Sequence, residues 1–270
     1  MVTDLLRHPS LVFVVSFVVL WFATWIGAFL RGKLGFEVPE DLRADFGVIL
    51  AASLTLLGLI IGFSFSMATT RYDLRKSYEE EEANAIGTEY VRADLLPQAD
   101  AAQVRALLRQ YTDARIQFYN TSDRDQLPHI NQDTAQLQNK LWATVTGPAN
   151  AQPTPVIALA VSGMNDVTNS QGYTQAAWWN RIPAAAWGMM TAIALVANVL
   201  LGVGAHRTKA TLFVVVPLVV AVAFMLIADI DSPRGGVIRV RPQNLESLRD
   251  RKSTRLNSSH VRLSRMPSSA

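Results

Sequence analysis

The stretch GFSFSMATTRYDLRKSYEEEEANAIG, residues 62–87, decides the fold, because an apolar run passes into dense charge without an intervening proline. No proline occurs in the range 46–95, and residues 71–82 are mostly good helix formers. One helix over this range would hold about 50 residues and extend about 75 Å, more than twice the ~30 Å hydrocarbon core of a bilayer. We therefore predict a single helix that leaves the membrane and continues into water. The alternative is a helix that stops near Met67 and restarts near Tyr72, because the ATT between them is a weak helical stretch.

Four stretches are long and apolar enough to cross a bilayer as helices, which takes roughly 20 residues. The first two carry no charge, the third has Asn198 as its only strongly polar side chain, and the fourth contains Pro217. Buried helices of soluble proteins rarely stay uncharged around their whole circumference for so long. We therefore predict an all-α integral membrane protein with four transmembrane helices, at residues 10–30, 46–67, 182–204 and 211–228.

Basic residues near the ends of the spans predict the sidedness of the chain. The first span is expected to be a retained signal anchor. A cleaved signal peptide is the alternative, but the apolar core exceeds the usual ~7–15 residues and lacks a small-x-small cleavage site. With four spans, both termini and the middle segment share one side, which has nine basic residues against five on the other. We expect that side to be the cytoplasm, for a multi-pass protein of the bacterial inner membrane. The nine are Arg7, Arg71, Arg75, Lys76, Arg181, Arg234, Arg239, Arg241 and Arg249; the five are Arg31, Lys33, Arg43, Arg207 and Lys209.

The segment between the second and third spans, residues 71–181, is too polar for lipid and is predicted to be an all-helical cytoplasmic segment. Pro97 stops one helix, and Asp100 is available to cap the next. A turn is expected at 123–128, followed by helices at 131–145 and 156–180. Two sets of apolar residues recur at helical spacing. They are a weaker stripe of Ala83, Ile86, Tyr90 and Ala93, and a stronger one of Val104, Leu107, Leu108, Tyr111, Ala114 and Phe118.

The C-terminal sequence has the pattern of a translated sequencing-library adapter. DRKSTRLNSSH (250–260) and SRMPSSA (264–270) are translations of consecutive parts of a common adapter, in order and correctly spaced. We therefore exclude residues 250–270 from the prediction of the fold, the alternative being a natural basic tail.

Together with the spans, this divides the chain into an N-terminal transmembrane hairpin, the cytoplasmic segment, a C-terminal transmembrane hairpin, a C-terminal tail and the adapter translation. Their bounds are 1–70, 71–181, 182–231, 232–249 and 250–270.

Excluding the adapter translation, residues 250–270, changes what the net charge implies about partners. The whole chain has 25 basic and 22 acidic residues, a net charge of +3. Residues 250–270 hold five basic residues and one acidic, which leaves 20 against 21, a net charge of −1. The basic balance that would favour nucleic acid is therefore absent, and we expect no nucleic-acid partner. The chain has no Cys, which excludes disulfides, thiolate metal sites and a Cys nucleophile.

Small residues mark one face of the second span. Gly58, Gly62 and Ser66 follow one another at intervals of four, a spacing that lets another helix approach closely. One interpretation is packing against the first or third span. The other is contact with a neighbouring subunit or the lining of a narrow passage, with Ile61 and Phe65 beside it.

Two acidic clusters are further candidates. The run Glu79 to Glu82 suggests a cation site, but four consecutive helical residues point in four directions, so we expect a solvated face. Asp229, Asp231 and Arg234 lie where the fourth span ends, at a depth where ionisable groups are functional candidates; pairing that finishes a helix explains them equally well. His8, His129 and His206 lack the spacing of a metal site. The sequence predicts no catalytic, cofactor-binding or metal site, and no enzyme.

The sequence resembles a bacterial membrane-protein family named bestrophin-like, whose function is uncharacterised. The resemblance lies in GFSFSMATTRYDLRKSYEEEEANAIGTEYVRADLLP (62–97), RIPAAAW (181–187) and LIADIDSPRGGVIRV (226–240). The family name implies kinship with bestrophins, which are pentameric anion channels whose second span lines a hydrophobic neck. No bestrophin neck or calcium-clasp motif is matched residue by residue, so no site residue is transferred.

Two hypotheses for function follow. The first is a homo-oligomeric channel for inorganic anions, a pentamer by this resemblance, with the second span around the pore and a constriction at Ile61 and Phe65. The second is a non-conducting membrane scaffold or sensor that binds a partner through its cytoplasmic helices. A transporter or membrane enzyme is a third, weaker class, since no broken-helix repeat or buried charge relay is visible.

Overall fold

The computed structural model describes residues 8–34, 39–204 and 212–251, and in these ranges every regular element is a helix. The chain divides into two compact units. We call residues 1–72 with 180–239 the membrane unit, and residues 73–179 with those from 240 onward the polar unit. The predicted adapter translation lies outside the described residues from 252 onward.

Helix α3, Arg43–Arg92, is one element of 50 residues, which confirms the predicted continuous helix. The weak stretch does not break it, and the hydroxyls of Thr69 and Thr70 donate hydrogen bonds to the carbonyls of Phe65 and Ser66 at 3.0 and 2.9 Å. The 3₁₀ turn η2, Ala93–Leu95, follows at once. Helix α3 thus supplies its first 30 residues to the membrane unit and its remainder to the polar unit.

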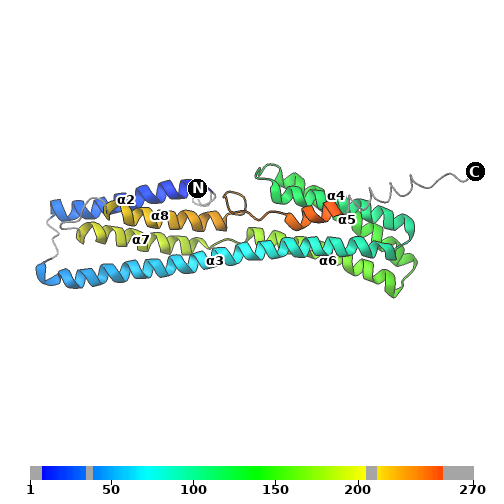
Figure 1. Cartoon of the computed structure of the whole chain (residues 1–270), viewed down its shortest axis with the longest axis horizontal. Coiled ribbons are helices and arrows are strands. Elements are labelled where there is room, and N and C mark those ends of the chain that lie inside the picture. The colour runs from blue at the N-terminus through cyan, green and yellow to red at the C-terminus, as the bar shows by residue number, and fades with distance from the viewer. Residues whose placement is uncertain (1–7, 35–38, 205–211, 252–270) are drawn as a thin grey trace, which may run out of the picture. The chain divides into compact units, whose positions relative to one another are not determined.

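The membrane unit combines the first part of α3 with α2 (Pro9–Leu34), α7 (Ala184–Gly204) and α8 (Leu212–Asp231), and α2 packs against both α7 and α8 (Figure 1). Four described helical segments are long and apolar enough to cross a membrane, which confirms the four predicted spans. All four helices contribute to one apolar core. Its buried members are Val12, Leu20, Leu57, Ala68, Ile182, Trp187, Met190, Ala194, Val220, Phe224, Ile227, Ala228 and Ile230.

Helices α2 and α7 make a backbone-to-backbone contact at Gly27 and Gly202. A Cβ at Gly202 would collide with the carbonyl oxygen of Thr24, and one at Gly27 with that of Val199. One turn away, Thr24 donates a hydrogen bond of 3.1 Å to the side-chain oxygen of Asn198, whose amide donates to a carbonyl of its own helix. The one strongly polar side chain of the third span is therefore satisfied inside the unit, as hydrocarbon requires.

The polar unit contains the second part of α3, with α4 (Gln98–Asn120), α5 (Leu127–Ala151), α6 (Pro155–Trp179) and the helical residues 243–251. Helix α5 packs against both α4 and α6. The predicted stripe of α4 forms its buried face, with Val104, Leu108, Tyr111 and Phe118 almost fully buried.

Two local predictions in the polar unit are wrong. The helix expected at 131–145 runs from Leu127 to Ala151, since Pro128 sits in its first turn, where the missing N–H is not needed. Pro148 lies in its last turn, so it removes one hydrogen bond near an end instead of breaking the helix. Asp100 does not cap α4, because that helix already begins at Gln98; its carboxylate lies in the first turn, where the helix dipole favours it.

The Gly27–Gly202 contact predicts a strong effect of one added methyl group. Gly202→Ala should lower the stability of the membrane unit by about 3 kcal/mol, because the new Cβ meets backbone that cannot move aside. Thermal unfolding of the detergent-solubilised protein measures this. Gly188→Ala is the matched control, because a Cβ at Gly188 on the same helix meets no atom within 4 Å. Equal melting temperatures for the two variants would contradict the contact.

Candidate functional site

The small-residue face of the second span is exposed in the single chain. Gly58, Gly62 and Ser66 are all exposed, and a Cβ added to either glycine would meet no described atom of another helix within 4 Å. The predicted alternative of close packing against another span of the same chain is therefore not seen. The face stands open at a point where a second helix backbone could approach.

The two bulky candidates beside this face have different surroundings. Ile61 is partly buried and packs against the core of the membrane unit, whereas Phe65 is 40% exposed. Leu57, Ser64 and Ala68 form the buried side of the same segment. Phe65 is thus free to face a pore or a neighbour, while Ile61 lies at the border of the intramolecular contact.

The acidic residues at the end of α8 bind backbone N–H groups. Asp229 accepts hydrogen bonds from Val237 and Ile238 at 2.8 and 2.9 Å, and Asp231 accepts one from Ile182 at 3.1 Å. A Cβ at Gly236 would overlap the Asp229 carboxylate. These bonds tie the end of α8 to the turn that follows it and to Ile182, two residues before α7. Arg234 is partly buried in that same turn.

The expectation that the acidic run forms a solvated face is wrong for its first and last members. Glu80 and Glu81 are exposed, but Glu79 and Glu82 are 1% and 0% exposed. Glu79 accepts backbone hydrogen bonds from Asn244 and Leu245, both at 3.0 Å, and one from the Asn244 side chain. Burial raises the pKa of Glu79, and the bonds from Leu245 and Asn244 oppose that rise. Its carboxylate therefore caps the helix at residues 243–251.

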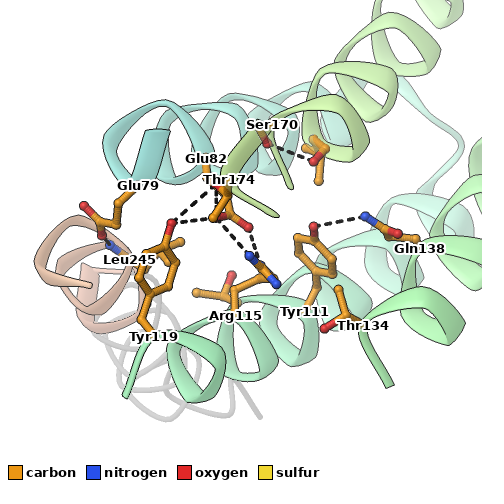
Figure 2. A network of polar contacts seen from close by, with 12 residues as sticks. Glu79, Glu82, Tyr111, Arg115, Tyr119, Thr134, Gln138, Ser170, Thr174 and Leu245 are labelled. Carbon is orange, nitrogen blue, oxygen red and sulfur yellow. Dashed lines mark hydrogen bonds and ion pairs between the residues drawn. The ribbon is translucent and has the colours of Figure 1, made fainter. Parts of the chain in front are cut away.

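Glu82 is the centre of a buried polar network, whose carboxylate lies among side chains of α4 and α6 (Figure 2). Arg115 donates to both carboxylate oxygens, from Nε and from Nη2. Tyr119 and Thr174 donate hydroxyl hydrogen bonds to Oε2 at 3.1 and 3.2 Å. One carboxylate thus joins three helices of the polar unit.

Aromatic rings enclose the cation of this network. The Arg115 guanidinium lies 4.4 Å from the centre of the Phe118 ring, and Trp178 packs against Phe118 at 5.0 Å. Burial alone would lower the pKa of Arg115, but Glu82, Tyr111 and Tyr119 together raise it, so the group stays charged. Burial also raises the pKa of Tyr119, with Glu82 adding to the rise, so its hydroxyl remains a donor.

The chemistry of this network is structural. Both oxygens of Glu82 accept hydrogen bonds, from Arg115, Tyr119 or Thr174, and the side chain is fully buried. Among the described residues, no three acidic, His or Cys side chains gather as a metal site would require. The network therefore holds α3, α4 and α6 together within the polar unit.

The comparisons with known proteins identify the family. The model of the bestrophin-like domain matches residues 38–245. The chain belongs to the bestrophin-like family. Crystal structures of a bacterial bestrophin homologue from Klebsiella pneumoniae share its fold. One, phased with zinc, has a TM-score of 0.59 at 13% identity and covers 88% of this chain and 94% of its own. Two single-residue variants give TM-scores of 0.60 and 0.62 at 12% and 11% identity, with 88% of this chain covered in each case and 96% and 98% of their own. No curated protein sequence matches.

Sequence reasoning missed the buried network of this bestrophin-like chain, although one signal for it was present. Glu82 precedes Ile86 by four residues and Glu79 precedes it by seven, so both share the face of the weaker apolar stripe. Charge on an apolar face indicates a buried partner as well as it indicates solvent. The partner, Arg115, lies 33 residues away on another helix, and nothing local identifies it.

Breaking the Glu82–Arg115 pair should be costly. Arg115→Met leaves a buried carboxylate without its cation and is expected to lower the free energy of unfolding by about 3–5 kcal/mol. The double variant Arg115→Met with Glu82→Gln should recover part of this lost free energy, because the carboxylate is then absent. Thermal unfolding in detergent measures both. Arg105→Met is the matched control, since its partner Asp94 is 68% exposed and such surface pairs contribute less than about 1 kcal/mol. A loss from Arg115→Met no larger than that of the control would refute the assignment.

Proposed function

We propose that this chain is one subunit of a homo-oligomeric ion channel that passes inorganic anions, with α3 lining the pore. The observation that carries the proposal is the bareness of the second span. In its most apolar 18-residue window only 6% of residues are buried within the chain, against 28%, 39% and 44% for the other three candidate spans. A helix that packs so little against its own chain has surface available for packing against other subunits.

The exposed side of α3 has a chemistry that suits both a helix contact and a pore wall. The hydroxyls of Ser53 and Thr55 donate to carbonyls one turn earlier, both at 2.8 Å, so they need no partner in lipid. The same hydroxyls can turn toward water in a passage. Gly58 and Gly62 permit close approach, and Phe65 supplies an apolar constriction that can gate by dewetting.

Family membership supports an oligomeric membrane channel over an enzyme. The resemblance to bestrophins implies a pentamer that conducts anions around its second span, and the second span is the one left bare here. We place the protein in the bacterial inner membrane as a multi-pass protein. The excess of basic residues beside both termini and the polar segment puts these on the cytoplasmic side. The lipid bilayer is the remaining partner.

The small-residue face should control assembly. Gly62→Leu is expected to convert the oligomer into monomers without unfolding the chain, because a Cβ at Gly62 meets no described atom within 4 Å while the larger side chain would block a neighbouring backbone. Light scattering of the detergent-solubilised protein gives the mass. Gly188→Leu, also open to 4 Å within the chain, is the control and should keep the oligomer. A Gly62→Leu protein of unchanged mass would show that this face does not assemble subunits.

Two phenylalanines of α3 provide a matched test of the pore. Phe63 and Phe65 are both exposed, at 61% and 40%. Because they are two positions apart on a helix, their side chains point in directions about 160° apart. Phe65→Ala should raise chloride flux into liposomes several-fold by widening an apolar constriction, and Phe63→Ala should leave it near that of the unsubstituted protein. Ile61→Ala is less informative, because Ile61 also packs in the core.

Absence of flux is an equally clear result. If intact oligomers in liposomes pass neither chloride, nitrate, sodium nor potassium, the channel proposal fails. A monomer without flux would favour the scaffold or sensor, whose partner would then bind the polar helices.

A further inference from the structure

Glu89 is a buried carboxylate without a partner. It lies on α3, seven residues after Glu82, and its side chain is 0% exposed. Within the part of the chain that the structure describes, neither of its oxygens has a hydrogen-bond donor, whereas Glu82 is bonded by three side chains. Leaving an ionised carboxylate in this state is far more costly than leaving it protonated.

The carboxylate lies directly against the backbone of α6. A Cβ at Gly163 would overlap Glu89 Oε2 and come within 2.7 Å of Arg92 Nη1. Any larger residue at 163 would therefore displace both side chains. Gly163 leaves room for the carboxyl group and for little else, so Glu89 depends on the packing of α6 for its burial.

The charged groups around Glu89 do not neutralise it. On its own helix, Arg92 is directed to α6, where Nη1 lies 3.5 Å from the carbonyl oxygen of Leu159 and 3.8 Å from Asp166. Asp166 itself is an acid and repels a second negative charge. Burial, with Asp166 adding to it and Arg92 opposing it, raises the pKa of Glu89 to about 8.

Among the described residues of the polar unit, Arg92 is the cation whose charge acts on the carboxylate. From α4, Arg105 and Arg109 bind the neighbouring residue Tyr90, at its carbonyl and its hydroxyl. Arg105 also pairs with Asp94 of η2. The helix at residues 243–251 meets this part of α3 through an apolar contact, between a methyl group of Leu248 and Gly87.

We propose that Glu89 is a proton-binding site that couples pH to the packing of α6 on α3. With a proton bound, the carboxyl group is neutral and the helices stay together; when the proton leaves, the charge favours an opened state in which water reaches Glu89. This property goes beyond conduction and does not depend on it.

The sign of the pH dependence follows from the difference between the two states. The pKa of Glu89 is about 8 when packed and about 4.5 when exposed, so the packed state holds the proton more tightly. The stabilisation is fully present below about pH 4.5, is lost as pH rises toward about 8, and changes no further above that value. Between these limits the opening equilibrium should rise up to about tenfold for each pH unit.

Cysteine labelling tests the opening directly, because the chain has no Cys of its own. Ala160→Cys places a thiol at a fully buried site of α6, one turn before Gly163, and Val156→Cys places one at a site that is 51% exposed on the same helix. The ratio of their maleimide reaction rates cancels the common ionisation of the thiol. We expect this ratio to rise at least about fivefold between about pH 6 and pH 8. A constant ratio in the chain with Glu89 intact would overturn the proposal.

Glu89→Gln supplies the second arm. Glutamine mimics the protonated carboxyl, so the labelling ratio should become constant with pH, and the melting temperature should lose the part of its decline that occurs between about pH 5 and 8. Glu80→Gln removes an exposed carboxylate from the same helix and should keep both dependences. If Glu89→Gln retains the pH dependence of the ratio, another group is responsible and the assignment to Glu89 is wrong. If that variant does not fold, the labelling of the Glu89 protein still decides.

Discussion

One unbroken ladder of backbone hydrogen bonds in α3 governs the rest of this structure. No proline interrupts the 50 residues from Arg43 to Arg92. In hydrocarbon, a span must satisfy its backbone internally, and a continuous helix does so. In water the same geometry needs a packed face to be stable, because isolated helices are marginal. The same helical repeat of α3 therefore has to present a suitable buried face both in the membrane unit and in the polar unit. The buried side chains of α3 in the membrane unit are small or apolar, namely Leu57, Ser64 and Ala68, whereas those in the polar unit include Glu82 and Glu89.

The two buried acids of α3 illustrate two ways of placing a carboxylate in a protein interior. Glu82 has a cation and two hydroxyls, so its charge is retained and its bonds fix the positions of α4 and α6. Glu89 has no donor among the described residues, and Arg92 on the same helix is directed to the Leu159 carbonyl of α6. Replacing either acid by an apolar residue of similar volume would be a simpler way to build a stable contact. We attribute the presence of Glu82 to the specific arrangement of three helices that its bonds define. We attribute the presence of Glu89 to the proton that it can exchange.

The sequence was sufficient for those features that depend on local pattern. Charge-free runs predicted four spans, the missing prolines predicted α3, and the spacing of Val104, Leu108, Tyr111 and Phe118 predicted the buried face of α4. It failed where the outcome depends on a distant partner. Glu79 reads as solvated until residues 243–251 supply N–H groups for it. Likewise, Pro148 reads as a helix stop unless its place in the last turn is known. The candidate face of the second span was found from its glycines, but only the structure shows that no described atom of another span lies within 4 Å of a Cβ there.

Apolarity alone does not say what covers the bare side of α3, since lipid chains are as apolar as leucine and satisfy such a surface without any protein partner. The small residues are the stronger argument. At Gly27 and Gly202 this same chain shows what glycines in its membrane helices do when a partner is present: they bring two backbones into contact. Gly58 and Gly62 have the same chemistry in a long apolar helix, yet a Cβ added to either would meet no described atom of another helix within 4 Å. A lipid tail gains little from a surface without side chains, whereas a second helix gains dispersion contacts along its whole length. The physical reason to place another subunit there is therefore the shape of the face. Its hydrophobicity is compatible with a second helix but equally compatible with lipid.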